Sequence, residues 1–195
     1  MLSHKKSLNI LKKTNALLEG HFVLSSGLHS SKYIQCAKLL SFPDKAEKIC
    51  KSLANKIKKN FTKIDLILAP AIGGIVIGYE IGRILKKETI FCERVKGKFV
   101  LRRGFKIKKG SKVLIVEDVI TTGKSSMECV KLIKKAKASI IGFASIIDRS
   151  TKKSLKIKKK IISHLKIDVP TYKSNSLPSE LKLIPITTPG SRFIK

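Results

Sequence analysis

One segment of the sequence combines residue types that could do chemistry at a spacing that few segments share. It begins with four apolar residues, continues with two adjacent carboxylates and ends in a turn of small polar residues. It reads Val113-Leu-Ile-Val-Glu117-Asp118-Val119-Ile120-Thr121-Thr122-Gly123-Lys124-Ser125. The apolar run predicts a buried strand, and the turn is typical of the start of a helix.

The order of these parts predicts a site for a phosphorylated sugar. In an open α/β sheet, ligands bind at the carboxyl ends of the strands, which is where Glu117 and Asp118 stand. Adjacent acids repel each other unless they serve a cation or a set of hydroxyls, and a sugar diol with Mg²⁺ close by meets that need. The turn Thr121–Ser125 presents backbone N–H groups and hydroxyls to a phosphate.

Two other nucleotide-binding patterns do not fit this segment. A Walker A loop needs glycine five residues before Gly123, and that position is Asp118. A dinucleotide-binding G-x-G-x-x-G is absent from the chain. An ordinary buried strand and turn would explain Val113–Val116, but not two acids followed by Thr-Thr-Gly-Lys-Ser.

The elements that must position this segment alternate along the chain. Short apolar runs predict strands, and i, i+3, i+4 patterns predict helices. We expect strands at Ile64–Ala69, Thr89–Cys92, Lys112–Val116, Ile140–Ile147 and Ile161–Val169. We expect helices at Ser7–Leu18, from Pro43-Asp44 to about Ile57, from Gly73 to about Leu85, and at Ser125–Lys137. Strands that alternate with helices predict an open, mostly parallel, Rossmann-like sheet flanked by helices, which is an α/β fold.

Other segments complete the organisation. Phe22–Ala37 is expected to be extended with a turn at Ser26-Gly27, and Gly20 is expected to stop the first helix. Glu93–Gly110 is predicted to be a basic hairpin or long loop. Lys152–Lys160 is predicted to be a solvated charge run, and the proline-containing tail to be irregular. We expect a single domain over 1–195, with a hood segment at 1–40 that the C-terminal tail contributes to, and a core at 41–150.

Composition limits the classes of partner. The chain has 42 Lys and Arg against 13 Asp and Glu, a net charge of +29. A positive charge of this size attracts anions. The lysines are spread along the chain and aromatic residues are only 6%, which favours small phosphorylated substrates over nucleic acid. The longest apolar run, Leu66–Tyr79, is too short for a membrane span. Four cysteines without metal-ligand spacing predict reduced, mostly buried thiols in the cytoplasm.

The segment Val113–Ser125 resembles the binding motif of type I phosphoribosyltransferases, which use phosphoribosyl diphosphate. The resemblance implies their fold, with a small N-terminal hood. It implies that Glu117 and Asp118 hold the ribose hydroxyls and are the catalytic residues, with Asp118 also able to assist proton transfer. It also implies that the turn binds the 5′-phosphate. The donor-binding set is therefore expected to include Glu117, Asp118, Val119, Ile120, Thr121, Thr122, Gly123, Lys124 and Ser125.

Further stretches resemble the orotate phosphoribosyltransferases within this family. They are Gly20–Ser30, Ala69–Gly74, Glu93-Arg94 with Leu101–Gly104, and Pro189–Arg192. In that family an arginine at the position of Arg149 grips the orotate carboxylate, and Arg offers a planar fork of donors that suits a carboxylate. We therefore expect Thr121 and Arg149 to bind orotate. Many members carry lysine where Ser25 stands, and Tyr-Lys where Ile72-Gly73 stands. The basic loop is also short compared with some relatives, so this chain resembles a shorter-loop branch.

The resemblance also implies the reaction and its partners. Orotate would displace diphosphate from phosphoribosyl diphosphate and give orotidine 5′-phosphate, a step in making pyrimidine nucleotides. Arg94, Lys96 and Lys98 are expected to contact the donor diphosphate. Mg²⁺ is the expected cofactor, held mainly through the substrate rather than by protein ligands. The basic loop is expected to close over a neighbouring subunit's site, which implies a homodimer.

Two other functions fit part of the sequence. A purine or uracil phosphoribosyltransferase would share Glu117–Ser125 but would not need Arg149 or the hood pattern. A non-catalytic regulator could use the same fold to sense phosphoribosyl diphosphate and bind nucleic acid, and the +29 charge is the best support for it.

Overall fold

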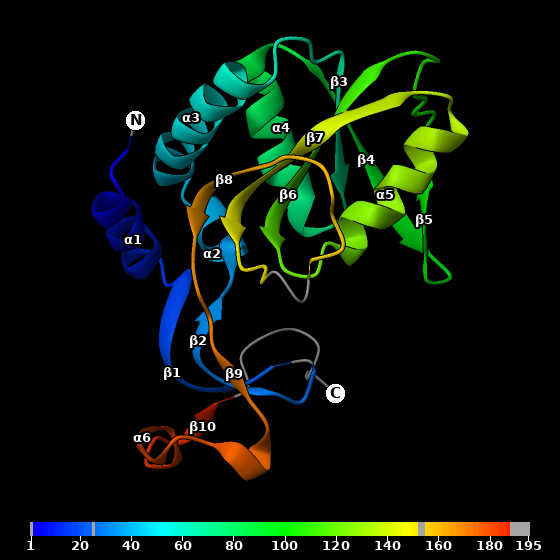
Figure 1. Cartoon of the computed structure of the whole chain (residues 1–195). Coiled ribbons are helices and arrows are strands. Elements are labelled where there is room, and N and C mark those ends of the chain that lie inside the picture. Colours follow the sequence, from blue (N-terminus) through cyan, green and yellow to red (C-terminus); the bar gives the residue numbers. More distant parts are fainter. Residues whose placement is uncertain (1, 25, 152–154, 188–195) are drawn as a thin grey trace.

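The computed structural model describes residues 2–24, 26–151 and 155–187. It contains two sheets, drawn in Figure 1, of which the larger forms the body of the molecule. The large sheet has the strand order β5-β4-β3-β6-β7-β8. Its strands are β3 (Leu66–Pro70), β4 (Glu88–Val95), β5 (Lys98–Leu101), β6 (Lys112–Ile120), β7 (Ser139–Asp148) and β8 (Ile161–Lys166).

Five of these strands run parallel, and only the edge strand β5 is antiparallel to its neighbour. Helices cover both faces (Figure 1), which explains why the central strands are almost wholly apolar. One face packs against α3 (Pro43–Asn60) and α4 (Gly73–Leu85). The other packs against α5 (Lys124–Lys135). The predicted α/β fold with a mostly parallel sheet is therefore confirmed.

Several local features predicted from the sequence are present in the core. Pro43 stands at the first position of α3 and Asp44 in its first turn, as predicted. The glycines of α4 allow the predicted close approach to the sheet, because a Cβ added at Gly78 would lie 2.7 Å from the Cβ of Ala69. The four cysteines are free and buried, which confirms their predicted burial. No helix in the described part of the chain is both long and apolar enough to span a membrane.

The small sheet forms the hood, with the strand order β10-β1-β2-β9. Its hairpin, β1 (Leu17–Val23) and β2 (His29–Ile34), receives two short strands from the tail, β9 (Thr171–Tyr172) and β10 (Ile186–Thr187). Hydrogen bonds of the buried His21 hold the tail against the hairpin. Its Nδ1 lies 3.1 Å from the carbonyl oxygen of Ile184, and its Nε2 lies 2.7 Å from Nδ1 of His29. Short helices complete the hood and its connection to the core, namely α2 (Cys36–Leu40), η1 (Ser174–Ser176) and α6 (Ser179–Lys182).

The expectation of an irregular tail was therefore wrong over residues 171–187. Strands of two residues show no hydrophobic period of their own, and they form because distant hood strands supply their hydrogen-bond partners. The stretches at Ser25, at residues 152–154 of the charge run, and at Pro189–Arg192 lie outside the described residues. The described remainder of the charge run contains no helix or strand, as predicted.

Two predicted element ends were also wrong. The first helix, α1 (His4–Lys13), ends before Thr14, whose hydroxyl donates to the carbonyl of Ile10, and Asn15 then takes a positive φ of 54°. Leu18 and Gly20 consequently lie in β1. Strand β6 continues to Ile120, because its parallel pairing with β7 runs on from Val116 to Ile120. The two carboxylates thus lie within the strand rather than after it.

Candidate active site

A hollow of about 110 Å³ lies where β6 turns into α5, at the carboxyl edge of the large sheet. Its position is the one where open α/β sheets bind ligands. The structure brings eight of the nine residues predicted from the donor-binding motif to its walls. They are Glu117, Val119, Ile120, Thr121, Thr122, Gly123, Lys124 and Ser125.

The turn between β6 and α5 has the geometry of an anion site. Gly123 caps α5 with a positive φ of 72°, and a Cβ there would lie 2.7 Å from Ile157, so only glycine fits. The hydroxyl of Thr122 accepts from the N–H of Lys124 at 3.3 Å. The first N–H groups of a helix have no partner within it, and together with the helix dipole they favour a phosphate.

The two carboxylates point to opposite faces of the sheet, because side chains alternate along a strand. Glu117 points toward α5, where its Oε1 accepts a hydrogen bond from the hydroxyl of Ser126. It is only 7% exposed, and burial is the main reason that its pKa rises to about 7, while hydrogen bonds from Ser126 oppose the rise. The charge of Asp118 raises this pKa further but is a smaller cause than burial.

Asp118 points toward the start of α4. A Cβ added at Gly73 would lie 2.6 Å from its Oδ2, so the bare backbone of Gly73 forms the wall against this carboxylate. Its Oδ1 accepts from the N–H of Val119 at 2.8 Å. Burial raises the pKa of Asp118, and that hydrogen bond partly offsets the rise. Because the two side chains point to opposite faces of the sheet, their carboxylates repel each other less than their adjacency in the sequence suggests.

Arg149 follows β7 and lies next to the same turn. Its N–H donates to the carbonyl of Ile120 at 2.8 Å, which fixes the backbone beside Thr121. Its Nε is buried and has no hydrogen-bond partner among the described residues. Burial lowers the pKa of Arg149, and Tyr33 of the hood partly offsets this. A buried guanidinium donor that lacks a protein partner is available to an anionic ligand.

The basic hairpin β4–β5 lies against α5 but outside the walls of this hollow. Arg94 pairs with Glu128 at 2.8 Å and stacks over the ring of Phe99 at 4.1 Å. Lys96 and Lys98 are exposed at the turn of the hairpin. Contact of these three residues with diphosphate stays a prediction, and in this structure Arg94 is engaged with α5.

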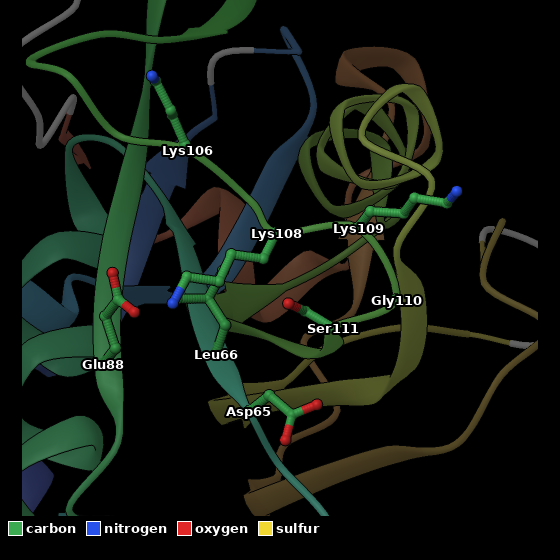
Figure 2. A pocket seen from close by; sticks show the side chains of 8 residues that line it. All are labelled: Asp65, Leu66, Glu88, Lys106, Lys108, Lys109, Gly110 and Ser111. Atoms are coloured by element: carbon green, nitrogen blue, oxygen red, sulfur yellow. The ribbon is translucent and has the colours of Figure 1, made fainter.

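A second, larger hollow of about 430 Å³ lies at the opposite edge, where β3, β4 and β6 begin. Its walls include Asp65, Glu88 and three lysines. Figure 2 shows that Lys108 extends across Leu66 toward Glu88, whereas Lys109 points away from the hollow. Both carboxylates are exposed, and Asp65 already accepts from the N–H of Lys112 at 2.8 Å.

The sequence reasoning missed three contributors to the candidate site. Ser126 supports Glu117, Gly73 forms the wall beside Asp118, and Glu128 holds Arg94. Only the position of Gly73, directly after a predicted strand, gave a signal, since glycine there permits close approach of the backbone. The contacts of Ser126 and Glu128 depend on which face of α5 is turned toward the sheet.

Comparison with known families identifies the fold and its chemistry. Residues 42–175 match the family model of the phosphoribosyl transferase domain. This chain belongs to the phosphoribosyltransferase family. Among curated phosphoribosyltransferases, an orotate phosphoribosyltransferase of Parvibaculum lavamentivorans is 45% identical over 194 residues, which cover 99% of this chain and 100% of that protein.

Solved phosphoribosyltransferases share the fold at lower identity. The orotate phosphoribosyltransferase of Aeropyrum pernix matches with a TM-score of 0.71 and 23% identity, over 82% of this chain and 92% of that one. An adenine phosphoribosyltransferase of Saccharomyces cerevisiae matches with a TM-score of 0.65 and 18% identity, over 81% and 99%. Since enzymes for different bases share this architecture, the fold alone does not select the base.

Proposed function

We propose that this enzyme transfers the phosphoribosyl group of 5-phospho-α-D-ribose 1-diphosphate to orotate, which yields orotidine 5′-phosphate and diphosphate in pyrimidine nucleotide synthesis. The observation that carries the choice of orotate is Arg149. Its buried Nε has no partner among the described residues and stands beside the phosphate-sized hollow of Glu117–Ser125. The similarity to the orotate enzyme of Parvibaculum lavamentivorans supports the same choice.

The geometry supports a division of tasks. The turn Thr121–Ser125 binds the 5′-phosphate, and the carboxylates of Glu117 and Asp118 accept hydrogen bonds from the ribose hydroxyls. Arg149 binds the orotate carboxylate, with Thr121 nearby. A ring nitrogen of orotate then forms a bond to C1 of the ribose while the bond from C1 to the diphosphate oxygen breaks. The protein acts mainly by positioning and by charge stabilisation.

Magnesium fits the chemistry of this site. The hydroxyls and carboxylates around the hollow are hard oxygen groups, and Mg²⁺ commonly takes substrate phosphates as ligands. Among the described residues, no group of three or more His, Cys, Asp or Glu could hold a metal. We therefore assign the metal to oxygens of the donor. When bound, Mg²⁺ supplies positive charge to the leaving diphosphate.

A homodimer is part of the proposal, and α4 offers a surface for it. Ile72 is 86% exposed, Val76 52% and Tyr79 66%, and these residues lie on one face of α4 and its start. A contiguous apolar face of this kind marks an interaction surface. Val76→Asp should convert a dimer into a monomer in sedimentation experiments, whereas Lys131→Asp, at an exposed position of α5 on the other face of the sheet, should not. The buried free thiols also support a cytoplasmic location.

The test of the function is orotate absorbance in the presence of the donor and Mg²⁺, with and without EDTA. We expect a protein-dependent loss of orotate that EDTA stops and added diphosphate reverses. No loss with orotate, but turnover of a purine or uracil with the same donor, would reject the base assignment. Failure with every base would favour a regulatory binder.

A further inference from the structure

Ser125 and Ser126 are adjacent on the first turn of α5 but face different groups. Ser125 lines the hollow, whereas Ser126 is wholly buried and does not. Neighbouring residues on a helix point about 100° apart, which explains the separation. The hydroxyl of Ser126 donates to Oε1 of Glu117.

Glu117 needs such a partner, because its surroundings disfavour its charge. It is 7% exposed, and the titratable groups near it are Asp118 on its own strand and the thiol of Cys129 on α5, which in turn contacts Cys92 on β4 at 3.5 Å. A buried carboxylate without hydrogen bonds takes up a proton instead of remaining charged.

We propose that Ser126 is a positioning residue for phosphoribosyl transfer, whose buried hydroxyl holds Glu117 ionised and in the orientation that receives the ribose hydroxyls. This inference rests on the proposed function, since it assigns the ribose to Glu117. An ionised carboxylate accepts hydrogen bonds about twice as strong as those to a neutral group, so loss of its charge weakens the grip on the donor.

The proposed role of Ser126 requires a side chain that carries a hydroxyl and is small enough for a buried position. Alanine removes the hydroxyl donor and keeps the backbone, so Ser126→Ala deletes the hydrogen bond to Oε1 of Glu117. Threonine keeps the hydroxyl and adds one methyl group in a fully buried place. Ser125→Ala is the matched comparison, because it removes a hydroxyl one residue away from the wall of the phosphate hollow.

The experiment is the pH profile of kcat/KM for the donor in the wild type, Ser126→Ala, Ser126→Thr and Ser125→Ala. The acid limb of the wild type should fall as pH drops through about 7, because Glu117 then takes up a proton. In Ser126→Ala we expect this midpoint to rise by about one pH unit, the shift that follows from losing one hydrogen bond to a charged group. Ser126→Thr should have the wild-type midpoint. Ser125→Ala should raise the donor KM but leave the midpoint of the acid limb unchanged.

A measurement that needs no turnover keeps the two proposals separate. Titration of the Glu117 side-chain carboxyl carbon by ¹³C NMR should give the same upward shift in Ser126→Ala, with folding checked by thermal unfolding. An unchanged midpoint in both experiments would overturn the role of Ser126. If the wild type does not consume orotate while the NMR shift appears, the base assignment fails and the support of Glu117 by Ser126 stands. If Ser126→Ala does not fold, a midpoint for Ser126→Thr away from that of the wild type overturns the proposal.

Discussion

The two edges of the large sheet carry similar residue types but differ in how those residues are held. The amino edge has the larger hollow, about 430 Å³ against 110 Å³, and both edges combine carboxylates with lysine. At the amino edge, Asp65 and Glu88 are exposed. At the carboxyl edge, Glu117 is buried and Asp118 is partly buried, and the pKa of each is raised by burial.

The difference shows that the size of a hollow is a poor guide to function in this molecule. Exposed charges are hydrated and are screened by salt, so they hold a ligand weakly. Charges kept out of water at the ends of parallel strands, beside a helix start, act at much greater strength. The raised carboxylate pKa values and the buried Arg149 Nε, which has no hydrogen-bond partner among the described residues, favour the carboxyl edge as the functional one.

The largest expected effect comes from removing one site carboxylate. Asp118→Asn should lower kcat/KM on the order of a hundredfold or more, because the group that meets the ribose loses its charge. Its unfolding midpoint should stay near that of the wild type. Asp65→Asn is the control at the amino edge and should change turnover by less than about twofold. Equal losses in the two variants would remove the distinction between the edges.

The next effect separates the two substrates at the carboxyl edge. Arg149→Ala should raise the KM for orotate roughly 10- to 100-fold, the value of a hydrogen bond between charged groups, and the KM for the donor far less. Steady-state kinetics with each substrate varied in turn measure this ratio. Lys108→Ala, in the hollow of the amino edge, should leave both values unchanged. A similar rise in both KM values for Arg149→Ala would refute its assignment to orotate.

A smaller effect tests the close wall around Asp118. Gly73→Ala would place a Cβ 2.6 Å from the carboxylate, so that side chain must move, and we expect kcat to fall about tenfold. Gly78→Ala is the matched change on the same helix, where a Cβ would lie 2.7 Å from the Cβ of Ala69. It should lower thermal stability with little effect on kcat. A normal kcat in Gly73→Ala would mean that Asp118 needs no fixed position.

The last prediction concerns pH and separates loss of activity from loss of the fold. His164, on β8, lies 2.8 Å from the hydroxyl of Ser7 through Nε2, and burial lowers its pKa from 6.5 to about 4. The unfolded chain therefore binds more protons between these values, and His164 should reduce stability by up to about 3 kcal/mol as pH falls from 6.5 to 4. Denaturant unfolding should have a weaker pH dependence in His164→Gln. Activity should decline first, near pH 7, where Glu117 titrates.

The sequence predicts much of the carboxyl edge because its parts are contiguous. Strand, acids, turn and helix follow one another from Val113 to Ser125, so pattern and spacing are enough. The resemblance added Arg149, which the structure places beside Ile120. The parts that escaped prediction depend on contacts between distant segments. They are Ser126 against Glu117, Gly73 against Asp118, and the tail strands against the hood.

Element ends were missed for a related reason. The apolar pattern of α1 continues through Leu18, yet the side chain of Thr14 captures a backbone carbonyl and the chain turns into a strand. Strand β6 runs past its apolar residues because pairing with β7, and not hydrophobicity, sets its length. A side-chain hydrogen bond four residues back decides the first case, and pairing with a distant strand decides the second. Neither is part of the apolar pattern.

The most direct test of the central claim is to map donor binding on the ¹⁵N-labelled protein by NMR, with phosphoribosyl diphosphate and Mg²⁺ added stepwise. We expect saturable shifts of the backbone amides of Thr121–Ser125 and Arg149, with no shifts at Lys108–Ser111. Saturable shifts at Lys108–Ser111 without any at Thr121–Ser125 would contradict the assignment of the carboxyl edge as the active site.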